Sequence, residues 1–314
     1  MICGLCACSR LNNQDEWEKL RRMGSIEGVR IRFDHVSIAV NSIDRGVDFF
    51  RRYFPTYPRH EKQTSEQASG GFLWQDFYVG GVAVEFIQEL PGHDGFVTKF
   101  IRNHGEGMHH ISFEIDRLDP VVAALKRDGV RIVDEYALED GSRTAFVSPR
   151  SAFGTLIQFW QPVDYDNPEP KPADDGRVRF DHVALAVRDI RRAMEFFGRY
   201  FGAQVIDQPT PSSTQGDFIL AHMDIGGFEI EFLQSPRPGT AHDFVGDFIE
   251  RHGEGLHHFT LDVKDDFEGI LNRLKRDGVR IVGRETNWRG EGQFFISPRS
   301  AFGTLIQVWG GRAG

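Results

Sequence analysis

The chain has 314 residues, of which 40% are hydrophobic and 26% are charged, and this length and composition favour about two ordinary globular domains. Its formal net charge of -9 argues against nucleic acid as a partner, because proteins that bind phosphate backbones gather Lys and Arg on one surface. It contains no uncharged apolar run of about 18 residues and no secretory signal pattern, so we expect no membrane partner and a cytoplasmic location.

The N-terminal segment carries all of the cysteine. Cys3, Cys6 and Cys8 leave the remainder of the chain without a thiol, which excludes a disulfide framework there. Such a cluster could ligate a metal or carry a lipid, but neither a second ligand cluster nor a matching acylation motif accompanies it. We therefore interpret residues 1–28 as a flexible leader.

Strand-like and helix-like patterns alternate in the segment that follows. The apolar run Phe33–Val40 predicts a strand, and apolar residues at helical spacing predict a helix over Asp44–Phe54. Two more strands are predicted at Phe72–Val79 and Val82–Gln88. They are joined at Gly80-Gly81, a dipeptide that favours a tight hairpin.

The pattern restarts after a short helical segment near Asp94–Asn103. A strand is predicted at His110–Ile115, and the helix after it begins near Pro120 and ends before Gly129. Two further strands close the first half of the chain, Thr144–Val147 and Thr155–Trp160.

Four segments of this first half return in the same order in the second. They are RIRFDHVSIAV at 30–40 and RVRFDHVALAV at 177–187, HGEGMHH at 104–110 and HGEGLHH at 252–258, LKRDGVRIV at 125–133 and 274–282, and SPRSAFGTLIQ at 148–158 and 297–307. The repeat predicts tandem domains at residues 29–161 and 177–311, with the Pro- and Asp-rich segment 162–176 as an extended linker. Helices near Ile190–Tyr200 and Phe267–Asp277 and a hairpin at Gly226-Gly227 repeat the pattern.

A strand, a helix and several strands therefore occur four times along the chain. This order fits neither a sandwich of parallel βαβ units nor a coiled coil. We predict an α+β fold with mixed, mostly antiparallel sheet.

Each half places two histidines, one glutamate and one glutamine in its predicted strands. The candidate metal ligands are His35, Glu85, His110 and Gln158 in the first half, and His182, Glu231, His258 and Gln307 in the second. Imidazole, carboxylate and amide oxygen together suit Zn, Co, Ni, Mn or Fe(II), and such a set leaves positions open for water or substrate.

A plainer interpretation competes with metal binding. A single histidine in an apolar strand is more often a hydrogen-bonded core residue than a ligand, and duplication copies structural and functional residues alike. The glutamates shift the balance, because Glu85 in VAVEFI and Glu231 in FEIEFL would be costly to bury without a partner. A metal would satisfy them, whereas an outward-facing position on a half-exposed sheet is the alternative.

The repeated segments resemble methylmalonyl-CoA epimerase and the glyoxalase-like members of the vicinal oxygen chelate superfamily. The runs FDHVSIAV, FDHVALAV, HGEG-x-HH and SPRSAFGTLIQ carry the resemblance, which spans most of the chain after the leader. It implies two βαβββ units in each half, cupped around one metal site whose ligands fall on the eight residues named above. Of the pairs 109–110 and 257–258, the second histidine matches the ligand, because strand alternation points the first to the opposite face.

The resemblance implies an isomerase or epimerase that moves a proton beside a metal-chelated carbonyl or hydroxy-carbonyl group. The candidate bases are the ligand carboxylates Glu85 and Glu231, followed by Glu106 and Glu254 in the HGEG loops.

Two departures from the epimerase pattern bear on the reaction. Gln158 and Gln307 stand where a glutamate is usual, and an amide cannot accept a proton. Ser-Pro-Arg, at 148–150 and 297–299, replaces the HP-[KR] turn of the epimerases, which argues against coenzyme A thioesters as substrates.

Two other functions remain open. Fe(II) dioxygenases similar to the extradiol enzymes or 4-hydroxyphenylpyruvate dioxygenase also have tandem domains, but their facial triad takes its carboxylate from the final strand, where glutamine stands here. A binding protein similar to the antibiotic-sequestering members would need no metal. Aromatic residues would then hold an apolar ligand, although a place in the core is the plainer interpretation of each: Trp74, Phe77, Phe218, Trp288 and Phe294. Every alternative has a small-molecule partner, and both a monomer and a homodimer are compatible with the sequence.

Overall fold

The computed structural model of the chain describes residue 26 and residues 28–65, 71–171, 176–212, 218–237, 243–286 and 291–312. The three cysteines of the predicted leader lie outside these residues, as does Trp288. Within the described part, no helix is long and apolar enough to cross a membrane.

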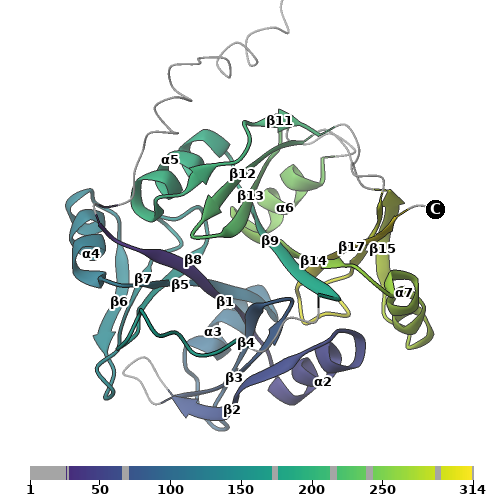
Figure 1. The fold of residues 1–314 in the computed structure, drawn as a ribbon, viewed down its shortest axis with the longest axis horizontal. Coiled ribbons are helices and arrows are strands. Elements are labelled where there is room, and N and C mark those ends of the chain that lie inside the picture. Colours follow the sequence, from purple (N-terminus) through teal and green to yellow (C-terminus); the bar gives the residue numbers. More distant parts are fainter. Residues whose placement is uncertain are drawn as a thin grey trace, which may run out of the picture.

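The first half of the chain forms one mixed sheet of eight strands, in the order β2-β3-β4-β1-β5-β8-β7-β6 (Figure 1). Its strands are β1 (Ile31–Ala39), β2 (Tyr57–Ser65), β3 (Phe72–Val79), β4 (Val82–Glu89), β5 (Gly107–Ile115), β6 (Ile132–Ala137), β7 (Arg143–Val147) and β8 (Leu156–Gln161). Its helices are α2 (Ile43–Tyr53), α3 (Phe96–His104) and α4 (Leu118–Arg127).

The second half forms its own sheet, in the order β10-β12-β13-β9-β14-β17-β16-β15, with β11 paired to β12 beside this path. Its strands are β9 (Val178–Ala186), β10 (Gln204–Val205), β11 (Thr210–Pro211), β12 (Ile219–Ile225), β13 (Phe228–Gln234), β14 (Gly255–Val263), β15 (Ile281–Thr286), β16 (Glu291–Ile296) and β17 (Leu305–Arg312). Its helices are α5 (Ile190–Phe201), α6 (Phe244–His252) and α7 (Phe267–Arg276).

Each sheet consists of two βαβββ units joined through their first strands. Within a unit the first strand pairs in parallel with the last, as β1 does with β4 and β5 with β8, and β1 pairs antiparallel with β5. The second sheet repeats this arrangement in β9, β13, β14 and β17. The predicted α+β fold, with four βαβββ units in two mixed sheets, is confirmed.

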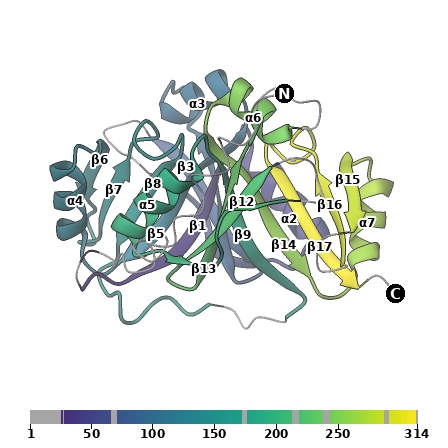
Figure 2. The ribbon, with the colours of Figure 1, turned by 90° about the horizontal axis from the view of Figure 1, so that it is seen from above.

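Helices α2 and α5 lie between the two sheets and join their cores. Phe50 of α2 contacts Phe86 of its own sheet and Phe259 of the second sheet, with ring centroids 5.9 and 6.3 Å away. In the same way Phe201 of α5 packs on Phe113 of the first sheet at 5.1 Å. The buried apolar residues of both halves form one continuous cluster. The halves therefore pack back to back, with α4 and α7 at opposite ends of the molecule (Figures 1 and 2).

The other face of each sheet is left to form a cup. On β1, Val36 and Ile38 belong to the shared core, so the alternating residues His35, Ser37 and Ala39 face the cup. Helix α3 closes one end of this cup, where Ala39 packs with residues of that helix. Helix α6 takes the equivalent place over β9.

The glycine pairs at 80–81 and 226–227 form the central hairpins, as predicted. Gly80 and Gly226 have φ of 58° and 60°, a left-handed conformation that glycine adopts without strain. Each also approaches the opposite half, and Gly80 accepts a backbone hydrogen bond from Phe180 at 2.9 Å.

The sequence pattern did not predict the edge strands β2 and β6. Strand β2 is polar and largely exposed, so its sequence carries little of the apolar alternation that marks a half-buried strand, and β6 is a short strand in which no residue is buried. The helix predicted to begin near Pro120 begins two residues earlier, at Leu118.

Candidate metal centres

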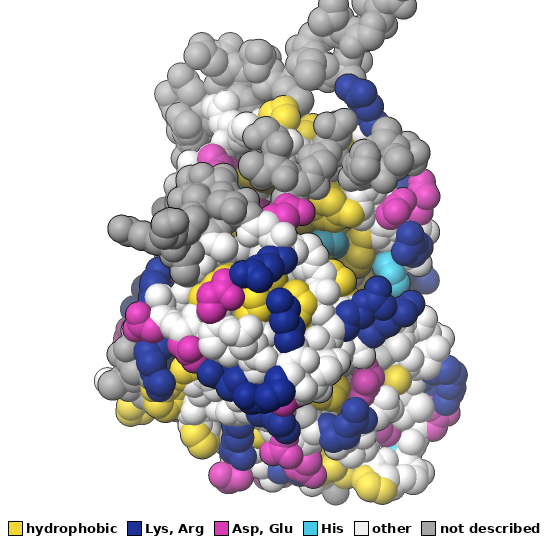
Figure 3. Space-filling view, turned by 90° about the vertical axis from the view of Figure 1, so that its right-hand side faces the viewer, with side chains coloured by type: hydrophobic (Ala, Val, Ile, Leu, Met, Phe, Trp, Pro, Cys, Tyr) yellow, Lys and Arg dark blue, Asp and Glu magenta, His cyan; other side chains and the backbone are white. Residues whose placement is uncertain are grey.

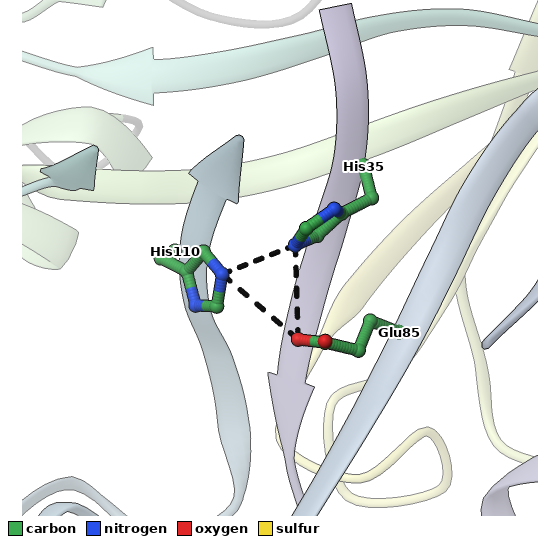
Figure 4. Close-up of side chains that lie close together, drawn as sticks. All are labelled: His35, Glu85 and His110. Atoms are coloured by element: carbon green, nitrogen blue, oxygen red, sulfur yellow. Dashed lines mark hydrogen bonds and ion pairs between the residues drawn. The ribbon is translucent and has the colours of Figure 1, made fainter. Parts of the chain in front are cut away.

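Three side chains from adjacent strands meet in the first cup. His35 of β1 and His110 of β5 bring their Nε2 atoms to 3.1 Å from one another (Figure 4). The Oε2 atom of Glu85, from β4, lies 3.7 Å from Nε2 of His35 and 3.9 Å from Nε2 of His110. All three side chains offer a ligand atom at one point in space.

The strand register explains why residues so distant in sequence meet. Strand β1 lies between β4 and β5, and its residue Ser37 is directly opposite Glu85 on one side and His110 on the other. His35 is two residues away on the same face. Gln158 lies on the next strand, opposite Ser112 of β5.

Gln158 presents its amide oxygen to this cluster. Its Oε1 lies 3.2 Å from Nε2 of His110, while its Nε2 donates a hydrogen bond to Oγ1 of Thr144 at 3.1 Å. Because the amide nitrogen is occupied, the oxygen is the atom available to a cation. The structure thus brings together all four predicted residues of the first half.

The second cup repeats the cluster with one change. Oε2 of Glu231 lies 3.7 Å from Nε2 of His182 and 3.6 Å from Nε2 of His258. Gln307 is linked to this group through Thr260, whose hydroxyl donates to Oε1 of Gln307 at 2.6 Å and lies 2.9 Å from Nε2 of His182. A threonine therefore lies between the glutamine and the first histidine in this cup.

Buried polar atoms without a partner favour a cation at both clusters. Oε2 of Glu85 and Nε2 of His258 are buried and accept no hydrogen bond from the described residues. Such an atom costs free energy unless something satisfies it, and a divalent cation bound by imidazole and carboxylate would do so. The donor set fits Zn, Co, Ni, Mn or Fe(II).

An aspartate holds the first histidine of each cluster from behind. Nδ1 of His35 lies 2.7 Å from Asp34, and Nδ1 of His182 lies 2.8 Å from Asp181. If Nδ1 donates this hydrogen bond, Nε2 carries a free lone pair directed at the cluster, as in many metal-binding histidines. Burial alone would raise the pKa of Asp34, but His35 and, after it, Arg59 at 3.0 Å keep the pKa of that carboxyl well below its usual range.

The two glutamates differ in their surroundings. Burial raises the pKa of Glu85, although His35 opposes the shift. Burial acts in the same direction on Glu231, but His182 and a hydrogen bond from His222 hold the pKa of Glu231 at about 2. Nε2 of His222 lies 3.3 Å from Oε1 of Glu231. The surroundings therefore favour the anionic form of Glu231 more strongly than that of Glu85.

A histidine and an aspartate have exchanged places between the two halves. In the first half Asp76 lies opposite Glu85 in the β3–β4 hairpin and is bound by His60 at 2.8 Å. In the second half it is His222 that lies opposite Glu231, and its Nδ1 is 2.7 Å from Asp207. The sequence patterns did not single out these residues, because the exchange of histidine and aspartate becomes visible only when the two hairpins are aligned.

The first histidine of each adjacent pair leaves the cluster. His109 packs against Phe100 of α3 with ring centroids 4.8 Å apart, and His257 packs against Phe248 of α6 at the same distance. Burial lowers the pKa of both imidazoles to about 4.

Glu106 and Glu254 do not reach the clusters. Oε1 of Glu106 accepts a hydrogen bond from the backbone N–H of Asn41 at 2.7 Å, and Oε1 of Glu254 accepts one from Arg188 at 2.7 Å. Each carboxylate thereby fixes the turn that follows β1 or β9. These second candidates for the base are held by loop backbone and are not among the described groups that could hold a metal.

A cavity of about 600 Å³ opens beside the first cluster, and His35, Glu85 and Gln158 line it. The segment after β8, which the sequence predicts as an extended linker, forms one of its walls through residues 162–164 and 167–169. Glu169 anchors this wall at 3.3 Å from Nε of Arg59 and 3.4 Å from Nε2 of His60. The linker is thus part of the first cup.

A second cavity, of about 410 Å³, lies beside His257 and is lined by α6 and by Phe295. Figure 3 shows the end of the molecule that carries α7, where histidine side chains are visible in a hollow beside hydrophobic ones.

Of the aromatic residues considered as ligand contacts, Trp74 lines the first cavity. Phe77, Phe218 and Phe294 are buried in apolar clusters instead.

Comparison with known proteins assigns the family. The profile of the Glyoxalase/Bleomycin resistance protein/Dioxygenase superfamily matches residues 34–146 and again residues 181–296. The chain belongs to this superfamily. Both matches include the histidines and the glutamate of their cluster, so the two cups are two copies of the superfamily domain.

Relatives in the superfamily match one domain at a time. The "Uncharacterized protein YqjC" of Bacillus subtilis is 31% identical over 133 residues, which cover 42% of this chain and 92% of that protein. The mitochondrial methylmalonyl-CoA epimerase of Homo sapiens is 26% identical over 133 residues, 41% of this chain and 72% of the epimerase.

Two solved structures align with both halves of the chain together. A mutant of 4-hydroxymandelate synthase from Streptomyces coelicolor has a TM-score of 0.64 at 17% identity. The aligned part covers 91% of this chain and 93% of the synthase. The Mn(II)-bound glyoxalase from Novosphingobium aromaticivorans has a TM-score of 0.55 at 17% identity. The aligned part covers 90% of this chain and 83% of the glyoxalase. At this identity the likeness shows the shared fold alone.

Proposed function

We propose that this protein is a divalent-metal-dependent isomerase or epimerase that transfers a proton beside a carbonyl or hydroxy-carbonyl group. The observation that carries the proposal is the unsatisfied carboxylate oxygen of Glu85, which lies between two histidines at the wall of a cavity of about 600 Å³. Epimerases among the sequence relatives support the same class of reaction.

His35, Glu85, His110 and Gln158 would hold the cation of the first cup, and His182, Glu231 and His258 that of the second. A divalent cation there would bind two neighbouring substrate oxygens and polarise the carbonyl, which makes the adjacent C–H more acidic. The clusters leave room for these oxygens, because only three or four protein donors converge at each.

Glu85 is the base that the geometry favours. A base must lie within reach of the proton and have a pKa near the working pH, and burial raises the pKa of Glu85 towards that range. Glu231 is already engaged by His222 and has a pKa of about 2, so it accepts a proton less readily. We therefore assign proton transfer to the first cup.

The test is exchange of substrate hydrogen with deuterated water, using a panel of hydroxy-carbonyl and 2-substituted acyl compounds without oxygen. We expect Glu85→Gln to lower exchange by about 10²–10⁴-fold, because a general base contributes a factor of this size. The matched variant Glu231→Gln should lose much less. Full exchange in Glu85→Gln would exclude Glu85 as the base.

The same assay separates the alternative functions. Proton exchange needs no oxygen, so turnover that appears only in air would favour a dioxygenase instead. Binding of a panel compound to metal-free protein, without exchange under any condition, would favour a binding protein.

A further inference from the structure

We propose that the first cup selects substrates whose end remote from the chelated oxygens is cationic or neutral, and that it discriminates against anionic ones. The inference rests on the proposed function, because it concerns the substrate of that site. It comes from the charges that line the cavity and from the linker that supplies two of them.

Carboxylates dominate the described lining of this cavity. It contains one arginine, two histidines and no lysine, against seven acidic side chains: Asp34, Asp76, Glu85, Glu114, Asp140, Asp164 and Glu169. A concave surface lined by one sign of charge concentrates the field inside it and attracts molecules of the opposite sign.

The nearby cations are already committed to the inner carboxylates. Arg59 lies between Asp34 and Asp76, with Nη1 at 3.0 Å from the first and 3.3 Å from the second. Arg32 is paired with Glu114. Two arginines and one divalent cation at the cluster would together offset four of the seven negative charges.

The remaining negative charge lies at the rim of the cavity. Asp140 accepts hydrogen bonds from Ser142, and Asp164 accepts them from Asn167, so neutral groups satisfy both. Glu169 is 59% exposed and shares Arg59 with the two inner aspartates. These carboxylates face the end of a substrate that points away from the cluster.

The linker makes this charge pattern a property of the first cup. Asp164 and Glu169 belong to the segment that joins the halves, and Lys171 secures its far end by donating to the backbone O of Gly81 at 3.2 Å. An anionic tail such as a phosphate or carboxylate would meet this wall, whereas an ammonium group would be attracted to it.

The experiment uses three small hydroxamic acids that share one oxygen-chelating head and differ in tail charge. They are 6-aminohexanohydroxamate with an ammonium tail, heptanohydroxamate with a neutral tail and pimelic monohydroxamate with a carboxylate tail, so that five methylene groups separate the tail charge from the chelating oxygens. Binding is measured by calorimetry on the full chain loaded with Mn(II), as wild type and as His258→Ala, with the metal content determined for each.

We expect the ammonium compound to bind the first cup about tenfold more tightly than the carboxylate compound at low salt. The preference should shrink as salt rises, because screening weakens charge interactions at exposed rims. It should also shrink in Asp164→Asn/Glu169→Gln. The matched variant Asp48→Asn/Asp94→Asn removes the same charge outside the cavity lining and should keep the preference.

Each other outcome has a defined meaning. Equal affinity for the three compounds, or tightest binding of the carboxylate compound, would overturn the charge selection and leave the proposed function standing. Failure of all three to bind the metal-loaded protein would overturn the proposed function itself.

Discussion

At the residue scale, the two cups differ most in what lies beside their glutamates. His222 binds Glu231 in the second cup, whereas Asp76 occupies the equivalent place beside Glu85 in the first. A positioned glutamate is a better metal ligand, because less freedom is lost when the cation binds. An unpositioned one with a raised pKa is a better base. We therefore propose that the two sites differ in chemistry while sharing the same kinds of candidate ligand.

The role of His222 predicts unequal metal retention. Replacement by asparagine should weaken metal binding at the second site by about 10–100-fold, the usual effect of losing a partner that orients a ligand. The first site should be unaffected. Stopped-flow chelator competition measures both dissociation phases. His60→Asn is the matched control, and a change in both phases or in neither would contradict the assignment.

The buried histidines His109 and His257 predict a loss of stability at acidic pH. Their pKa is about 4 in the folded protein, below the value of about 6.5 expected when unfolded. The two imidazoles therefore bind more protons in the unfolded chain between these values, so their contribution to stability is constant above about pH 6.5 and falls as the pH drops towards 4.

When the pH is lowered from 7 to 5, each of these histidines should lower the free energy of unfolding by about 2 kcal/mol. Urea unfolding of the chelator-treated protein at both pH values measures the effect. His109→Leu should remove about 2 kcal/mol of this pH dependence, because it removes one buried imidazole whose pKa is lowered by burial. An unchanged pH dependence in His109→Leu would contradict this account.

The candidate ligands stand out in the sequence because each combines a chemical signal with a repeat. A carboxylate in an apolar strand and histidines at the same place in both halves selected Glu85, Glu231, His110 and His258. The environment that separates their roles was not predictable. It depends on cross-strand neighbours such as His222, which only the register brings into contact.

At the scale of elements, strands that face a core were predictable and strands at the sheet edges were not. Apolar alternation marked β1, β3, β4 and β5, whereas the polar strand β2 carries almost none. The linker was predicted as a spacer from its Pro and Asp content. Its packing over the first cup follows from single pairs such as Glu169 with Arg59, for which the sequence has no pattern.

Loops between strands also hold the halves together. Gly154 follows a turn before β8 with φ of 72°, and an added Cβ there would collide with the backbone O of Glu254 in the other half. Gly303 has the same relation to Glu106. The HGEG loops therefore contact the opposite half of the chain at the joint.

Gly154→Ala should destabilise the protein by about 3 kcal/mol or more, since it combines a left-handed backbone with overpacking at the joint. Gly129→Ala is the matched control. It has φ of 76° and open space around the added Cβ, so it should cost only about 1–2 kcal/mol. Equal losses in urea unfolding would show that the contact with Glu254 is unimportant.

At the scale of the whole molecule, tandem duplication supplies what a second subunit would otherwise provide. Helices α2 and α5 pack on the opposite sheets, and Tyr53 and Tyr200 donate hydrogen bonds to Asp277 and Asp128 across the joint. The repeat predicted two domains, but not that they share one core. That depends on apolar faces whose partners lie in the other half of the chain.

Both cups are proposed to bind a divalent cation through their histidines. The most direct measurement is elemental analysis of untagged protein after reconstitution, for wild type, His110→Ala and His258→Ala. We predict about two metal ions per chain in wild type and about one in each variant, because each substitution removes a donor from a different cluster. Wild-type protein that holds no metal after reconstitution, or variants that keep both ions, would contradict the account.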